Sequence, residues 1–216
     1  MRQQSDSMQE DFVGLKFIHR LCEDPSAPLI ILVHGRAGNA QVMWAFDRTL
    51  PERAHVVSFE AFLADALGGF SWWDMASEKP LEPEILRARD RLQFAIERYI
   101  ELFSLHPSLI IGVGFSQGSV LLSAAMLTGA LQLDGLAILA GFVSRVGDAS
   151  LIRGLPQVFV AHGTADEVLS IDKARKGVNR LRSCGLKVTF VEEEGVGHKL
   201  GIQGMKALKE WIQLVT

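Results

Sequence analysis

The chain has 216 residues, of which 48% are hydrophobic and 22% charged, and its formal net charge is −3. This length and composition indicate a single globular domain with a substantial core. The small net charge gives no reason to expect nucleic acid or an acidic membrane as a partner. The two cysteines, Cys22 and Cys184, lack the spacing of a metal site or disulfide, which favours reduced thiols.

The N-terminal residues 1–11 are polar and contain no apolar segment typical of a secretory signal. We expect a flexible tail over residues 1–11 and one domain over residues 12–216. The longest apolar stretches, such as Leu29–Val33 and Val120–Leu127, are far shorter than the roughly 20 residues that span a membrane. These features predict a cytoplasmic protein without stable membrane insertion.

In the first half of the chain, apolar runs of strand length alternate with helical patterns. We expect strands over Leu15–Leu21, Leu29–Val33 and His55–Phe59, and helices over Ala40–Leu50 and Glu84–Phe103. The run Leu29–Val33 is almost purely aliphatic, as in a strand covered on both faces. The long connection from Phe59 to Pro80 is rich in aromatic residues, which argues against disorder.

A Gly-x-Ser-x-Gly pattern, Gly114 to Gly118, follows the next apolar run and opens an Ala/Leu-rich segment. Strand, sharp turn and helix in this order indicate a nucleophile elbow, which exposes the oxygen of Ser116 at the tip of the turn. The flanking glycines leave room that a β-carbon would fill. The start of the following helix offers backbone N–H groups to a developing negative charge.

The second half of the chain continues the alternation. We expect strands over Leu109–Phe115, Gly135–Leu139, Val158–Ala161 and Lys187–Glu192, and helices over Ser119–Leu131, Ile171–Ser183 and Gln203–Val215. The whole pattern predicts an α/β fold with a mostly parallel central sheet and helices on both faces. Functional groups in such a sheet gather beyond the C-terminal ends of the strands.

A serine hydroxyl needs a base to accept its proton, and the base needs an acid to orient it. After this type of elbow the chain order is serine, then acid, then histidine. Only His162 and His198 follow the serine. We choose His198, in a glycine-flanked loop after the last strand, because His162 leaves almost no room for a strand-end acid before it.

Three carboxylates are candidates for the acid. Asp166 follows the strand that ends at Ala161 and is the first choice, Asp148 is the second, and Glu167 is the third. A tetrahedral oxyanion would be stabilised by the backbone N–H groups of Gln117 and of Arg36, in the loop after Leu29–Val33. The side chain of Arg36 could face solvent or an anionic substrate.

Through several of its motifs the chain resembles the α/β-hydrolase family of carboxylesterases, phospholipases and acyl-protein thioesterases. The matching segments, in family order, are Leu32–Gly35, Ser71–Asp74, Gly114–Gly118, His162–Val168 and Gly197–His198. The resemblance covers roughly Leu29 to the C-terminus, and the Phe-Ser-Gln-Gly form of the elbow is its most specific part.

The resemblance implies a compact α/β-hydrolase fold without a large cap domain and with Ser116, Asp166 and His198 as the catalytic triad. It also implies Arg36 and Gln117 as oxyanion donors, a small-molecule ester or thioester as substrate, no metal or organic cofactor, and often a homodimer. The chain departs from the family pattern at Arg36-Ala37, at Ser170 and over Val143–Gly154. These departures bear on substrate preference more than on mechanism.

The aromatic connection is expected to form an apolar acyl groove, with Phe70, Trp72 and Trp73 as substrate-binding residues. The alternative is that these aromatic side chains only cover the core. At about 0.8 kcal/mol for each buried methylene group, even a short acyl chain would bind usefully.

The sequence therefore predicts a serine hydrolase that cleaves carboxylic esters or thioesters through an acyl-enzyme intermediate. The alternative is a ligand-binding or interaction protein on a hydrolase fold. A nucleotide-binding loop over Gly112-Val113-Gly114 is disfavoured because Gln117 stands where the third glycine is required. A dienelactone-type hydrolase would have cysteine in place of Ser116.

Overall fold

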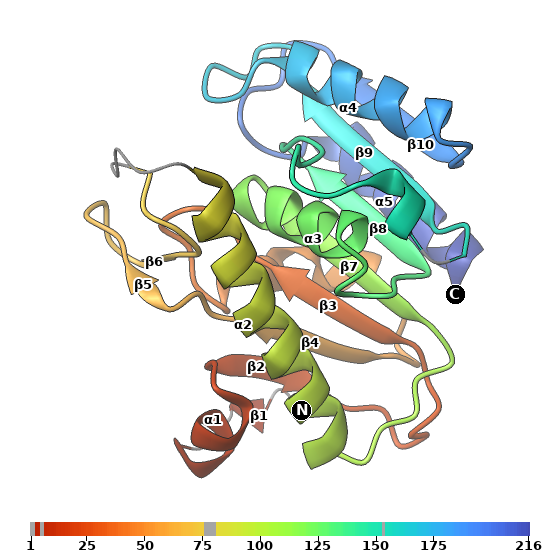
Figure 1. Cartoon of the computed structure of the whole chain (residues 1–216). Helices are drawn as coiled ribbons and strands as arrows, with labels where there is room; N and C mark the ends of the chain where they lie inside the picture. Colours follow the sequence, from red (N-terminus) through yellow and green to blue (C-terminus); the bar gives the residue numbers. More distant parts are fainter. Residues whose placement is uncertain (1–2, 5–6, 76–80, 153) are drawn as a thin grey trace.

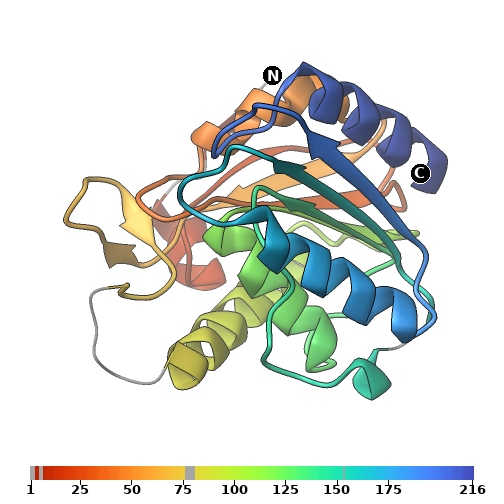
Figure 2. The ribbon, with the colours of Figure 1, turned by 90° about the horizontal axis from the view of Figure 1, so that it is seen from above.

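The structure is a computed structural model that describes residues 3–4, 7–75, 81–152 and 154–216. It has three layers, with helices on both faces of a twisted sheet (Figures 1 and 2). The order of the eight sheet strands found among the described residues is β1-β2-β4-β3-β7-β8-β9-β10. Their bounds are β1 Gln3–Gln4, β2 Phe17–Arg20, β3 Leu29–Val33, β4 His55–Phe59, β7 Ile110–Phe115, β8 Gly135–Leu139, β9 Gln157–Gly163 and β10 Val188–Glu193.

The sheet is parallel from β4 to β10, and β1 and β2 join its edge in antiparallel orientation. Every residue of β3, β4 and β8 is buried, which explains the apolar sequences of β3 and β8; in β4 the buried polar side chains His55 and Ser58 are hydrogen-bonded to backbone groups. The mostly parallel α/β sheet predicted from the sequence is confirmed. The C-terminal ends of β3, β7, β9 and β10 lead into the loops that carry the predicted site residues.

The helices divide between the two faces. α1 Ser7–Val13, α2 Leu81–Leu102, α3 Gln117–Leu127 and α4 Ile171–Ser183 cover one face, and η1 Val42–Thr49 and α5 Ile202–Val215 cover the other (Figure 2). A separate cluster of buried apolar residues lies on each side of the sheet. The predicted helix over Ala40–Leu50 is present only as the shorter 3₁₀ helix η1.

The predicted tail over residues 1–11 contains β1, which pairs with β2, and most of α1, which packs on α2; residues 1–2 and 5–6 lie outside the described residues. The flexibility of residues 1–11 and the domain boundary at residue 12 stay predictions. No helix within the described ranges is both long enough and apolar enough to cross a bilayer.

A two-stranded hairpin, β5 Leu63–Ala64 and β6 Phe70–Ser71, lies within the aromatic connection and projects beyond the layers (Figure 2). Residues 76–80 of this connection are outside the described residues. The hairpin is fixed by tertiary contacts, because Phe70 exchanges backbone hydrogen bonds with Gly38 in the loop after β3. This pairing places the hairpin beside the expected oxyanion loop.

Candidate active site

Ser116 stands between β7 and α3 in a sharp turn. Its φ of 50° lies in the left-handed region, which stores backbone strain at a non-glycine residue. A β-carbon at Gly114 would approach the backbone of Gly118 to 2.6 Å, and one at Gly118 would overlap the carbonyl oxygen of Val33. Gly114 is therefore required for the turn to close on itself, and Gly118 is required for it to pack on the end of β3.

The structure brings Ser116, His198 and Asp166 together. The Nε2 atom of His198 lies 3.0 Å from the Oγ atom of Ser116, and Nδ1 lies 2.7 Å from Oδ2 of Asp166. The three side chains come from the ends of β7, β10 and β9, at one edge of the sheet. In this arrangement the imidazole can accept a proton from the hydroxyl while the carboxylate orients it.

The side chain of Asp166 is fully buried, and its carboxylate accepts several hydrogen bonds. Its Oδ1 atom accepts hydrogen bonds from the N–H groups of Val168 and Leu169, at 2.9 and 2.8 Å. Burial would raise the pKa of Asp166, but the hydrogen bonds from Leu169, His198 and Val168 together hold it below the usual value. The carboxylate is therefore ionised and available to the imidazole at neutral pH.

The other candidates for base and acid do not join Ser116 in such a series. His162 is buried, with Nδ1 3.2 Å from the carbonyl oxygen of Gly141 and Nε2 2.7 Å from the carbonyl oxygen of Leu169 and 3.2 Å from Oδ2 of Asp166, so both ring nitrogens are occupied away from the serine. Asp148 accepts a hydrogen bond from the N–H of Ser150 and caps the short 3₁₀ helix η2, Ala149–Leu151. Glu167 is exposed. The arrangement favours His198 and Asp166 over these alternatives.

A buried glutamate that the sequence reasoning missed supports the loop of His198. Glu193 is the last residue of β10, and its carboxylate accepts hydrogen bonds from the N–H groups of Gly201 and Gly204, at 2.9 and 2.7 Å. An anion at the start of α5 is favoured by the helix dipole. The contact fixes both ends of the loop that carries His198.

The loop after β3 is held by His34, which lies in the matching segment Leu32–Gly35 but was given no role from the sequence. Its Nε2 atom accepts a hydrogen bond from the N–H of Ala61 (2.9 Å), so Nδ1 carries the proton and donates to the carbonyl of Gly35 (2.6 Å). The indole N–H of Trp72 donates to the carbonyl of His34. These bonds position the backbone that leads to Arg36.

His34 is expected to make the fold sensitive to mild acid. Burial lowers its pKa to about 4, although the hydrogen bond to Gly35 opposes this, whereas the unfolded state has a pKa of 6.5. Between these values the unfolded chain binds more protons, so lowering the pH from 6.5 to 4 removes about 3 kcal/mol of unfolding free energy. Urea unfolding at pH 7 and pH 4.5 measures this loss. A His34→Gln variant should lose less between the two pH values, and an equal loss would contradict the assignment.

The side chains of Arg36 and Gln117 make structural contacts with the aromatic connection. The guanidinium of Arg36 donates to Asp65 (2.9 Å), and Asp65 also accepts from Ser71. The amide of Gln117 accepts from the N–H of Trp72 and donates to the carbonyl of Trp73. Gln117 begins α3, so its own N–H has no acceptor within the helix.

The ion pair with Arg36 leads the groups that lower the pKa of Asp65 to about 2, followed by the N–H of Leu67 and the hydroxyl of Ser71. The hydroxyl of Ser71 in turn accepts a hydrogen bond from the N–H of Ala37. Ala37 has a φ of 57°, a conformation that glycine adopts more easily, at the position where the sequence departs from the family pattern. The β5–β6 hairpin thus holds this strained loop in place.

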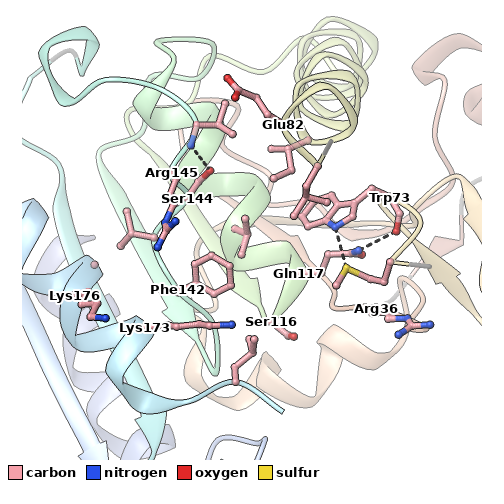
Figure 3. A pocket seen from close by; sticks show the side chains of 18 of the residues that line it. Arg36, Trp73, Glu82, Ser116, Gln117, Phe142, Ser144, Arg145, Lys173 and Lys176 are labelled. Carbon is pink, nitrogen blue, oxygen red and sulfur yellow. Dashed lines mark hydrogen bonds between the residues drawn. The ribbon is translucent and has the colours of Figure 1, made fainter. Parts of the chain in front are cut away.

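A cavity of about 770 Å³ opens at Ser116 (Figure 3). Trp73 lines it, but the expectation for Phe70 and Trp72 needs correction because neither lines the cavity. Trp72 is fully buried and supports the loop of His34, and Phe70 pairs with Gly38 and packs on the core. Besides Trp73, apolar lining comes from α2, α3 and the loop after β8, including Ile85, Val120 and Phe142.

No group of three or more His, Cys, Asp or Glu side chains arranged to hold a metal ion was found among the described residues. The two cysteines, Cys22 and Cys184, are free thiols, and they are half-buried and exposed, respectively.

Comparison with known proteins finds one matching family and several relatives. Residues 20–216 match the model of the phospholipase/carboxylesterase family. A rice (Oryza sativa subsp. japonica) protein described as a probable inactive carboxylesterase is 26% identical over 67% of this chain and 63% of its own length. Acyl-protein thioesterase 1 of Aspergillus fumigatus is 28% identical over 62% of this chain and 58% of its own. The chain thus spans about three fifths of these relatives.

Among solved structures, the carboxylesterase of Bacillus cereus superposes with a TM-score of 0.83 at 19% identity, covering 97% of this chain and 98% of that one. At this identity the similarity shows the α/β-hydrolase fold alone.

Proposed function

The chain belongs to the phospholipase/carboxylesterase family, and on that premise we propose that it is a serine hydrolase that cleaves carboxylic esters or thioesters through an acyl-enzyme. The supporting observation is the hydrogen-bonded series Ser116–His198–Asp166, with contacts of 3.0 and 2.7 Å. The strained elbow, the buried carboxylate and the cavity at Ser116 are all consistent with this function.

In the first half of the reaction, the Oγ atom of Ser116 attacks the carbonyl carbon while Nε2 of His198 accepts the hydroxyl proton. The carbonyl oxygen becomes an oxyanion, which accepts hydrogen bonds from the N–H groups of Arg36 and Gln117. The bond to the leaving oxygen or sulfur then breaks, and His198 gives its proton to the leaving group. The products are the acyl-enzyme on Ser116 and a free alcohol or thiol.

In the second half, water replaces the leaving group. His198 accepts a proton from the water as its oxygen attacks the acyl carbon, and a second oxyanion forms at the same donors. Collapse breaks the bond to Ser116, which regains its proton from His198, and the carboxylic acid leaves. Asp166 remains ionised throughout and stabilises the imidazolium that forms in each half.

Turnover of p-nitrophenyl butyrate tests this function. The purified protein should release p-nitrophenol with saturation kinetics and should also cleave a butyryl thioester. Absence of turnover for both substrates by the folded protein would contradict the proposal.

The second candidate is a non-catalytic binding protein, and a specific observation favours considering it. The rice relative is described as a probable inactive carboxylesterase. This chain differs from a simple loss-of-function case in that serine, histidine and carboxylate are all present and in contact. Reaction with a fluorophosphonate separates the two candidates, because it requires an activated serine.

A further inference from the structure

The cavity at Ser116 is lined by an unusual excess of positive charge. Among its described lining residues there is one carboxylate, Glu82, and there are five cations: Arg36, Arg145, Lys173, Lys176 and Arg180. The cations come from three separate segments, the loop after β3, the loop after β8 and helix α4. This excess contrasts with the net charge of −3 of the whole chain.

Helix α4 separates its charges between two sides. Lys173, Lys176 and Arg180 follow helical spacing along the side that lines the cavity. Arg175 lies on the other side, where it pairs with Glu192 and Asp172 at 2.6 and 3.1 Å. Carboxylates therefore neutralise Arg175, and Arg182, which does not line the cavity either, donates to the carbonyl of Val188.

Two of the five cations have structural partners. Arg36 is paired with Asp65. Arg180 donates to the carbonyl oxygens of Ser144 and Gly147 and interacts electrostatically with Asp148.

Arg145, Lys173 and Lys176, in contrast, have no carboxylate within ion-pair distance in the described part of the chain. Three cations at the cavity are thus available to a ligand.

Close packing of α4 places Lys173 beside the cavity. A β-carbon at Gly177 would lie 2.7 Å from Cγ2 of Val143, so the glycine lets α4 approach the loop after β8 closely. The ammonium group of Lys173 lies 5.6 Å from the centre of the Phe142 ring (Figure 3). Figure 3 shows Lys173 extending beside Phe142 on the side where Ser116 lies, with Glu82 across the cavity. The cavity therefore combines an apolar wall with a cationic side.

We propose that the substrate is an ester or thioester that carries a carboxylate or phosphate group away from the scissile bond, bound by Arg145, Lys173 and Lys176. This inference rests on the proposed hydrolase function and adds the class of substrate. The apolar wall accommodates the chain that joins the scissile bond to the anion, and the cations raise the local concentration of anionic substrate.

Matched esters test the inference. Ethyl pentanoate and monoethyl glutarate differ only in a terminal methyl or carboxylate group, and 1-butyrylglycerol and its 3-phosphate differ only in the phosphate. For at least one pair, kcat/KM at low salt should be about tenfold or more higher for the anionic member. The preference should shrink several-fold at 0.5 M salt, because exposed charges are screened. The pair that shows it identifies the anionic group as carboxylate or phosphate.

Paired variants locate the effect. Lys173→Gln/Lys176→Gln should remove most of the anionic preference, whereas Lys206→Gln/Lys209→Gln, on α5 across the sheet, should retain it. All four lysines are exposed, so neither variant is expected to disturb folding. An unchanged preference in the α4 variant would overturn the assignment.

Turnover of p-nitrophenyl butyrate by the same preparation establishes hydrolysis separately. If that ester is cleaved and neither anionic member is preferred, the inference about charge is wrong and the hydrolase function stands. If no ester is cleaved, the hydrolase function fails, and the inference fails with it.

Discussion

Replacing Ser116 by alanine is expected to reduce kcat for p-nitrophenyl butyrate by at least about 10⁴-fold while leaving the fold intact. The hydroxyl is the atom that would form the acyl-enzyme, and its one side-chain contact given by the structure is with His198. Alanine and serine have similar difficulty at a φ of 50°, so the strain of the elbow is unchanged.

The matched control is Ser183→Ala, an exposed serine at the end of α4. It should retain wild-type turnover. Circular dichroism and urea unfolding of both variants should match the wild type. Turnover by a folded Ser116→Ala protein at the wild-type rate would eliminate this residue as the nucleophile.

Asp166→Asn is expected to reduce kcat by about 10⁴-fold. The amide oxygen can still accept from the N–H groups of Val168 and Leu169, so the amide NH₂ would face Nδ1 of His198. Nδ1 would then act as an acceptor, and the proton would move to Nε2, which faces Ser116. The imidazole could no longer accept the serine proton.

Asp148→Asn is the control for this substitution, because Asp148 was the second choice of acid. Its carboxylate caps η2, so the variant should lose a little stability and keep its kcat. Glu167→Gln, at an exposed position next to Asp166, should also keep kcat. A large loss in either control, with little loss in Asp166→Asn, would reassign the acid.

The fold could be predicted where burial determines the sequence. Leu29–Val33, His55–Phe59 and Gly135–Leu139 are strands with the predicted bounds, because each is buried along its whole length and is therefore mainly apolar. The β5–β6 hairpin was missed. Its strands have two residues each and depend on contacts with Gly38 and Arg36, which no local pattern encodes.

The candidate site also contains residues that the sequence identifies and residues whose roles it does not reveal. Ser116, Asp166 and His198 could be named because chain order and strand ends restrict the choices to a few residues. Trp72 was assigned to the substrate groove from aromatic density, which does not distinguish a cavity wall from a buried support. His34 and Glu193 act through backbone groups brought close by folding, so chain order and strand ends do not reveal their roles, although His34 lies in a matching segment.

Covalent labelling by a fluorophosphonate tests the central claim most directly, since the probe reacts with a serine only when a base activates it. The wild-type protein should gain the mass of one adduct, and peptide mapping should place that adduct on Ser116. Ser116→Ala should gain none, and His198→Ala should react far more slowly. A folded wild-type protein that gains no adduct, or gains it on another residue, would contradict the account.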